Sequence, residues 1–286
     1  MKIKKAIVAV AGSGTRFLPA TKSQPKEMLP IVDKPIIQYL VEELVAAGIE
    51  DIIMVTRWDK KPLEDHFDRS FELEYGLEQA GKTRALEQVR KISSMANFIY
   101  VRQKQQYGNG VPILSAQTLV KDEPFVFAFG DDLVKSQTPF TKQLVRSYEK
   151  HQCPIIGVQK VPKDQVDRYG IVKLKLGTKE IADLVEKPNI KRAPSQLAQF
   201  GRMILTQEIV DELADTPVGK GNELWITDAV KTYVKKGGKV MVREVQGGEW
   251  MTTGDPLNYL KATVEYAMDR KDLAADFSDY IKKRLC

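Results

Sequence analysis

Cysteine is scarce in this sequence, and so is histidine, because its 286 residues include two of each. Cys153 and the terminal Cys286 are too few for a disulfide framework, and the Cys and His residues lack the spacing of a zinc site. Such low cysteine usage is typical of a reducing compartment. The sequence also contains no internal repeat and no low-complexity linker, so nothing in it marks a boundary between separate modules.

Long apolar runs and a strong charge of one sign are missing too. The amino-terminal apolar run is too short for a signal peptide or a membrane span, so we expect a cytoplasmic protein without a membrane partner. The net charge is +6 and the pI about 9.0, but the 38 acidic residues are interleaved with the 44 basic ones. A pocket for polyanionic small molecules explains this bias more simply than nucleic-acid binding does.

Apolar, β-branched runs alternate with longer amphipathic stretches along the whole chain, and 43% of the residues are hydrophobic. This alternation is typical of parallel strands joined by helices, so we expect an α/β domain with some antiparallel strands. Residues 57–91 are charged and helical in character. Strands are predicted at 5–10, 51–56, 97–101, 125–129, 154–161, 171–176, 181–186 and 240–245, and helices at 35–47, 111–119, 225–236 and from 255 onward.

The loop after the first predicted strand combines glycine with positive charge. Gly12 and Gly14 let backbone N–H groups approach a phosphate closely, and Arg16 and Lys26 add charge beside it. A dinucleotide-binding loop would need a small residue where Phe17 stands, which argues against a nicotinamide oxidoreductase, and the Gly-Lys-Ser/Thr of a Walker loop is missing. On the two glycines alone, a tight strand-to-helix turn is the simpler interpretation.

A longer pattern is more specific. Gly12-Ser-Gly-Thr-Arg16 followed by Pro25-Lys-Glu-Met-Leu-Pro30 resembles the signature loop of the sugar-1-phosphate nucleotidylyltransferases, in particular of the bacterial UTP–glucose-1-phosphate uridylyltransferases. Residues 66–74, His-Phe-Asp-Arg-Ser-Phe-Glu-Leu-Glu, are similar to an insertion of these uridylyltransferases that related thymidylyltransferases lack. Segments 186–188, 193–198 and 223–229 match the same family, so the resemblance spans nearly the whole chain, from residue 6 to about 268.

The resemblance implies where a nucleoside triphosphate would bind. Residues of the glycine loop would cradle the phosphates, Lys26 would stabilise charge at the α-phosphate, and Gln103 with the Gly108-Asn-Gly110 turn would read uracil. After that turn the chain has Val-Pro-Ile-Leu in place of the His-Ala-Val-Leu of the family, so contacts there are less well defined. The residues expected to bind the nucleotide are Ala11, Gly12, Gly14, Thr15, Arg16, Lys26, Gln103, Gly108, Gly110 and Asp131.

The resemblance also implies a magnesium site. Asp131 follows an apolar strand at the position of the metal-binding aspartate of the family, with Asp132 as its neighbour or helper, although an aspartate after a strand alone is equally a turn cap. The second metal ligand of the family would stand two residues before Gly254, where this chain has Thr252. Three explanations remain open: Asp131 holds Mg²⁺ with phosphates and water, Asp132 or Asp255 compensates, or the protein binds nucleotide sugars with weakened catalysis.

For the sugar phosphate, the resemblance implies that Lys187 pairs with the phosphate of glucose 1-phosphate and Glu186 accepts hydrogen bonds from sugar hydroxyls. Gly170 would let the hexose approach the backbone, and Gly201 also matches a family position. Taken alone, Val-Glu-Lys-Pro is a common surface sequence at a strand end.

Together these motifs imply transfer of a uridylyl group from UTP to α-D-glucose 1-phosphate, giving UDP-glucose and pyrophosphate, with Lys26, Arg16 and Asp131 as catalytic residues and Mg²⁺ as cofactor. Thymidylyl or cytidylyl transfer, and a regulator that binds nucleotide sugars, are the alternatives. The implied fold is a Rossmann-like three-layer α/β/α domain with a mixed, mainly parallel central sheet over residues 1–286. Residues 1–135 would form its nucleotide-binding half, 136–254 its sugar-phosphate half and 255–286 its carboxyl-terminal helices, and a homo-oligomer, dimer or tetramer, is expected.

Overall fold

The structure is a computed structural model that describes residues 2–104 and 107–285. Its centre is a mixed sheet with the strand order β10-β9-β11-β6-β1-β4-β5, to which β8 and β12 are added because β8 pairs with both β11 and β12. The strands β6, β1, β4 and β5 run parallel, whereas β11 is antiparallel to β6, β8 and β9. The α/β fold with a mixed central sheet is therefore confirmed.

The bounds of most predicted elements agree with the structure to within a few residues. The strands are β1 (Lys5–Ala9), β2 (Pro30–Ile31), β3 (Lys34–Pro35), β4 (Asp51–Thr56), β5 (Asn97–Arg102), β6 (Phe125–Phe129), β7 (Asp132–Ser136), β8 (Ile155–Lys160), β9 (Gly170–Leu174), β10 (Ile181–Glu186), β11 (Leu197–Leu205), β12 (Met241–Glu244) and β13 (Gly248–Thr252). The helices are α1 (Ile36–Ala46), α2 (Lys61–Phe67), α3 (Phe71–Gln79), α4 (Thr83–Ser93), α5 (Val111–Ala116), α6 (Phe140–His151), α7 (Gln207–Ala214), α8 (Ile226–Lys235), α9 (Pro256–Met268) and α10 (Ala274–Leu285).

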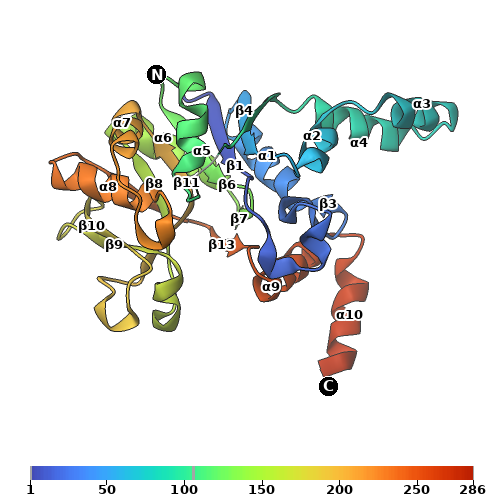
Figure 1. Ribbon diagram of the computed structural model, residues 1–286. Helices are drawn as coiled ribbons and strands as arrows, with labels where there is room; N and C mark the ends of the chain where they lie inside the picture. The colour runs from blue at the N-terminus through green and yellow to red at the C-terminus, as the bar shows by residue number, and fades with distance from the viewer. Residues whose placement is uncertain (1, 105–106, 286) are drawn as a thin grey trace.

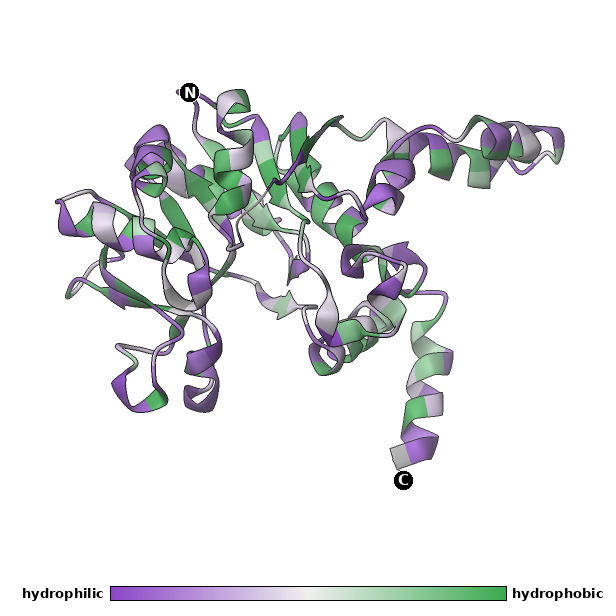
Figure 2. Cartoon of the chain, viewed as in Figure 1, coloured by the Kyte–Doolittle hydropathy of each residue, from purple (hydrophilic) through white to green (hydrophobic). Residues whose placement is uncertain are grey.

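The three layers follow from the two-residue repeat of the strands. Successive side chains of a strand point to opposite faces of the sheet, so Ala6 and Val8 pack with α1 on one face while Ile7 packs with α5 and α8 on the other. Figure 2 shows the hydrophobic residues concentrated on the central strands, with a mixture of both kinds on the outer helices. Each face of the sheet thus has its own apolar core.

Some elements were not predicted from the sequence. The nine-residue strand β11, the helices α6 and α7, and the small antiparallel sheet of β7 and β13 all lie in the half after Asp131. The predicted helix at 111–119 is wrong in its last turn, because α5 ends at Ala116 and residues 117–119 form a 3₁₀ turn. The glycine loop leads into short 3₁₀ turns before α1 begins.

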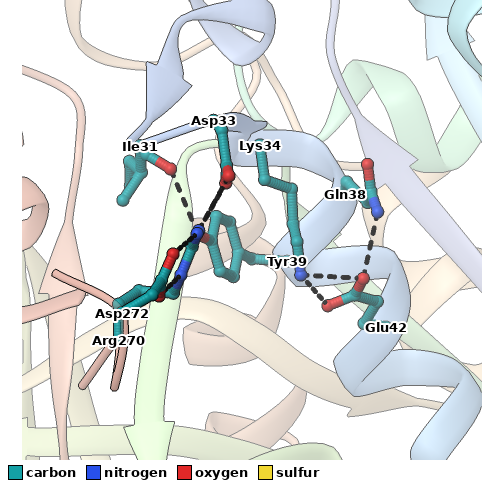
Figure 3. Close-up of polar contacts among 8 residues, drawn as sticks. All are labelled: Ile31, Asp33, Lys34, Gln38, Tyr39, Glu42, Arg270 and Asp272. Atoms are coloured by element: carbon teal, nitrogen blue, oxygen red, sulfur yellow. Dashed lines mark hydrogen bonds and ion pairs between the residues drawn. The ribbon is translucent and has the colours of Figure 1, made fainter. Parts of the chain in front are cut away.

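Two helical segments extend from the body of the protein, the arm of α3 and α4 and the terminal helix α10 (Figure 1). The segment before α10 is fixed by Arg270, whose guanidinium donates to both carboxylate oxygens of Asp33 at 2.8 Å and to Asp272 at 2.8 and 2.7 Å (Figure 3). To the right of it in the same view, past Tyr39, Lys34 Nζ donates to both Glu42 oxygens at 2.9 and 2.7 Å (Figure 3). Within the part of the chain described, no helix is both long and apolar enough to cross a bilayer.

Candidate active site

A cavity of about 690 Å³ opens at the carboxyl ends of the parallel strands. Four strands supply its wall in turn: Gly12 follows β1, Trp58 follows β4, Gln103 follows β5 and Asp131 follows β6. In open α/β sheets this edge is where ligands bind, because the loops there carry outward-facing polar groups close to one another. The topology thus gathers residues that lie far apart in the sequence.

A second cavity, of about 200 Å³, adjoins the first. The two share Asn109, Phe129, Asp131 and Trp225 as lining residues, so they meet at the end of β6. The smaller cavity is also bordered by Arg16, Gly170, Glu186, Lys187, Thr252 and Gly254. Ala11, Gly12, Lys26, Gln103, Gly108 and Asp131, expected for the nucleotide, therefore line the larger cavity, while Gly170, Glu186 and Lys187, expected for the sugar phosphate, line the smaller one beside it.

Lys26 and Asp131 form an ion pair at this junction, with Nζ 2.5 Å from Oδ2. Lys26 belongs to the 3₁₀ turn Lys26–Met28, in which the Leu29 amide donates to the Lys26 carbonyl. Burial alone would lower the pKa of Lys26, but the carboxylates of Asp131 and Glu27 outweigh burial, and the pKa is raised. Burial would likewise raise the pKa of Asp131, but Lys26 outweighs it and lowers that pKa. Both groups are therefore charged at neutral pH.

The glycine loop is folded against this pair. Gly12 lies where a Cβ would come within 3.5 Å of Lys26 Cε, so a glycine keeps the space over the lysine open. Gly14 has φ 64°, a backbone conformation that favours glycine, and its carbonyl accepts a hydrogen bond from Thr21 Oγ1 at 2.7 Å. Arg16, two residues on, donates to the Gly254 carbonyl at 3.2 Å and borders the smaller cavity. Thr15 and Gly14 line neither cavity and shape the loop instead.

Asp132 is buried, although it borders the smaller cavity. Its Oδ2 accepts from the Gly201 amide at 2.8 Å and its Oδ1 from Trp250 Nε1 at 3.0 Å, so both oxygens already have protein donors. Burial, with the neighbouring Asp131 as a second cause, raises the pKa of Asp132 to about 6. Gly201 is buried behind the cavities, where a Cβ would lie 2.2 Å from Phe129 Cγ. These contacts favour a structural part for both residues.

The expected uracil-reading residues lie where β5 ends. Gln103 lines the larger cavity, and its backbone N–H donates to the Thr56 carbonyl at 2.9 Å. Gly108 also lines this cavity. Its φ is 120°, and a Cβ on it would clash with the Leu224 backbone at 2.2 Å. Gly110 lies behind and donates its amide to the Leu224 carbonyl at 2.9 Å. Residues 105–106, between Gln103 and the Gly108-Asn-Gly110 turn, lie outside the described residues.

The expected sugar-phosphate residues surround the smaller cavity. Glu186 Oε2 accepts from Thr227 Oγ1 at 2.7 Å, which orients its carboxylate. Lys187 has φ 43°, and its Nζ lies 4.3 Å from the centre of the Trp225 ring and 3.9 Å from Glu186 Oε1. Gly170 borders the cavity, and a Cβ there would meet the Gln199 amide at 2.6 Å.

Asp131 is the residue best placed to hold a magnesium ion. Its carboxylate borders both cavities, whereas Asp132 is engaged by protein donors and Thr252 offers an uncharged hydroxyl that accepts from the Gly254 amide at 3.3 Å. Over residues 2–104 and 107–285, no group of three or more His, Cys, Asp or Glu side chains comes together as a metal site. Such a donor set fits Mg²⁺, which usually takes one or two carboxylates and completes its shell with substrate phosphates and water.

Several lining residues could not be found from the sequence. Trp58 and Tyr107 line the larger cavity, and Arg168 and Trp250 the smaller one. These residues belong to no motif of their own, and only the folded chain brings them to the cavities. A buried ion pair, Lys60 with Glu27, was also not predicted from the sequence.

Comparisons with known proteins agree with this arrangement. Residues 5–269 match the family described as nucleotidyl transferase. The chain is 47% identical over 285 residues to UTP–glucose-1-phosphate uridylyltransferase 2 of Staphylococcus saprophyticus, covering 99% of this chain and 98% of that protein. It is 46% identical over 275 residues to the UTP–glucose-1-phosphate uridylyltransferase of Bacillus subtilis, covering 95% of this chain and 94% of that protein.

Solved structures show the same fold. A UDP-glucose pyrophosphorylase in complex with UDP-glucose is similar with a TM-score of 0.84 and 41% identity, covering 94% of this chain and 100% of that one. A UTP-bound enzyme of this kind from Acinetobacter baumannii is similar with a TM-score of 0.89 and 38% identity, covering 98% of each chain. The chain belongs to the nucleotidyl transferase family and, within it, to the bacterial UTP–glucose-1-phosphate uridylyltransferases.

Proposed function

We propose that the protein transfers uridylyl from UTP to α-D-glucose 1-phosphate, which gives UDP-glucose and pyrophosphate. The observation that carries this proposal is the pair of adjoining cavities that meet at Asp131, with Lys26 on the same carboxylate. The larger cavity has the room for a nucleoside triphosphate, and Lys26 and Arg57 in its lining can pair with phosphates. The smaller one has the carboxylate and ammonium groups that suit a phosphorylated sugar. Uridylyltransferases 46–47% identical to the chain support this substrate pair.

In the proposed reaction a phosphate oxygen of glucose 1-phosphate attacks the α-phosphorus of UTP, and the bond to the pyrophosphate leaving group breaks. The chain mainly aligns the two substrates and neutralises their charge. Lys26 exchanges its contact with Asp131 for one with the α-phosphate, and Arg16 faces the incoming sugar phosphate. Glu186 accepts hydrogen bonds from sugar hydroxyls, and Lys187 pairs with the sugar phosphate.

We propose Mg²⁺ as the cofactor, held by Asp131. When bound, it would neutralise charge on phosphate oxygens. The carboxylate of Asp131 would turn from Lys26 toward the ion, which leaves the lysine free for the phosphate. A homo-oligomer, a cytoplasmic location, and the division into a nucleotide half, a sugar-phosphate half and carboxyl-terminal helices remain predictions.

Pyrophosphate release tests the proposal. The protein is incubated with Mg²⁺ and each combination of UTP, dTTP or CTP with glucose 1-phosphate or galactose 1-phosphate, and we expect UTP with glucose 1-phosphate to be turned over fastest. Lys26→Ala and Asp131→Ala should each lower kcat by about 100-fold or more, since each removes charge stabilisation at the reacting phosphate. Lys121→Ala is the matched control, because Lys121 is exposed at the amino end of β6, away from both cavities.

Near-normal rates in both variants would contradict the assigned roles. Faster turnover of dTTP or CTP would reassign the nucleotide, and UDP-glucose binding without any pyrophosphate release would favour a regulator over an enzyme.

A further inference from the structure

Trp58 is the most exposed of the three tryptophans. Its exposed fraction is 85%, against 9% for Trp225 and 7% for Trp250. A single exposed aromatic residue is not unusual on a protein surface, so exposure alone indicates nothing. Trp58, however, lines the larger cavity, where a ligand could cover its ring.

The turn that carries Trp58 is held at both ends. Before it, Arg57 donates to Asp59 at 3.1 and 2.6 Å and to Ser13 Oγ of the glycine loop at 2.9 Å. After it, Lys60 donates its amide to the Arg57 carbonyl and pairs with the buried Glu27 at 3.0 Å. The backbone under Trp58 is therefore fixed to the glycine loop and to the residue next to Lys26, while its ring has no ring partner among the described residues.

Trp58 also stands beside the amide expected to read the base. The strands β4 and β5 are parallel neighbours, with Thr56 opposite Arg102, and Gln103 follows directly while Trp58 follows two residues after Thr56. Both side chains line the same cavity, together with Tyr107, which is 69% exposed. An amide supplies a donor and an acceptor for the edge of a pyrimidine, and an aromatic ring supplies a surface for its face.

From these observations we infer that Trp58 is a stacking surface for the nucleobase and sets the affinity for the nucleotide, while Gln103 selects among bases. This inference rests on the proposed function, because it takes a uridine nucleotide as the occupant of the larger cavity. Stacking does not depend on which base is present, since every base has a π-face. The contribution of Trp58 should therefore be similar for UTP and CTP.

Equilibrium binding of nucleotides tests the inference. We compare wild type, Trp58→Ala and Trp58→Phe with UTP, CTP and inorganic tripolyphosphate, which has the phosphates without the base. Removing an aromatic stacking partner weakens base binding by about 5- to 150-fold. We expect Trp58→Ala to raise Kd for UTP and CTP by about tenfold or more, Trp58→Phe to raise it by less, and tripolyphosphate binding to stay unchanged in both.

Tyr75→Ala provides the matched control, because Tyr75 is an aromatic residue on α3 that is 55% exposed and lines neither cavity. Its UTP affinity should equal that of wild type. The fluorescence of Trp58, obtained as the difference between wild type and Trp58→Phe, should be quenched by UTP and not by tripolyphosphate.

A Kd for UTP in Trp58→Ala within twofold of wild type would overturn the inference. An equal loss of UTP and tripolyphosphate affinity would do so too, because it would mean damage to the cavity rather than lost stacking. The proposed function is tested separately. If wild type binds UTP through Trp58 but releases no pyrophosphate, the transferase activity is contradicted and the stacking role stands. If turnover is normal and Trp58→Ala binds UTP as wild type does, the stacking role is contradicted and the transferase activity stands.

Discussion

Replacing Lys60 by methionine should destabilise the protein strongly, although Lys60 lines neither cavity. Its ammonium lies 3.0 Å from Glu27 Oε2, and the two side chains are only 3% and 1% exposed. Removing one partner of a buried pair leaves the other charge uncompensated and costs about 3–5 kcal/mol. Lys26 is the next residue to Glu27 and also attracts its carboxylate, so we expect a loss at the lower end, about 3 kcal/mol.

Thermal and urea unfolding measure this loss. An unfolding entropy of about 2.1 cal/mol/K per residue gives about 0.6 kcal/mol/K for the 286-residue chain, so a loss of about 3 kcal/mol lowers Tm by about 5 °C. The double variant Lys60→Met/Glu27→Leu removes both charges and should regain most of the stability. Lys61→Met is the control: its side chain is 77% exposed, and its loss should cost less than about 0.5 kcal/mol. Additive losses in the double variant, within about 0.5 kcal/mol, would refute the reasoning.

Two further predictions concern a buried glycine and the α3–α4 arm. Gly201→Ala places a Cβ 2.2 Å from Phe129, which borders both cavities. Urea unfolding should show that the free energy of unfolding falls by about 1–3 kcal/mol, and steady-state kinetics should show a raised KM. An unchanged KM would show that Phe129 does not shift. Hydrogen bonds from Arg69 and then Arg90 lower the pKa of Glu74 from 4.5 to about 2, so its stabilisation of the arm is present above pH 4.5 and is lost as the pH falls toward 2. The protection factors of α3 amides, which correct hydrogen exchange for its intrinsic pH dependence, should therefore fall over this range in wild type and not in Glu74→Gln; the same profile in both would contradict it.

The sequence predicts the fold best where local pattern and tertiary structure agree. The apolar run of β4 and the helical face of α1 were predicted almost to the residue, because their side chains are buried in the order that their periods require. The strand β11 was missed, since Gln199, Gly201 and Arg202 interrupt its apolar pattern. Arg202 is fully buried there, where it pairs with Glu43 from α1 at 3.1 Å and donates to the Asp132 carbonyl at 2.9 Å. No local pattern indicates a partner so far away in the chain.

The candidate site divides in the same way. Motif residues such as Lys26, Asp131 and Glu186 were named from the sequence, and the structure places all three at the adjoining cavities. The sequence does not show that Asp132 is held by protein donors. One of them is the indole of Trp250, 118 positions away, which reaches Asp132 because β13 pairs with β7. Trp58 was missed for a related reason, because its place beside Gln103 follows from strand order and not from any motif.

Because Asp131 lies between the two cavities, the affinities of the two ligands are coupled. Asp131 borders both cavities, so a charged molecule in either cavity changes the electrostatic surroundings of its carboxylate. Whatever factor the first ligand imposes on the affinity of the second, the second must impose on the first, because the free energy of the ternary complex does not depend on the path to it. The two cavities are therefore thermodynamically coupled, and an affinity measured for one ligand alone does not give its affinity when the other ligand is bound.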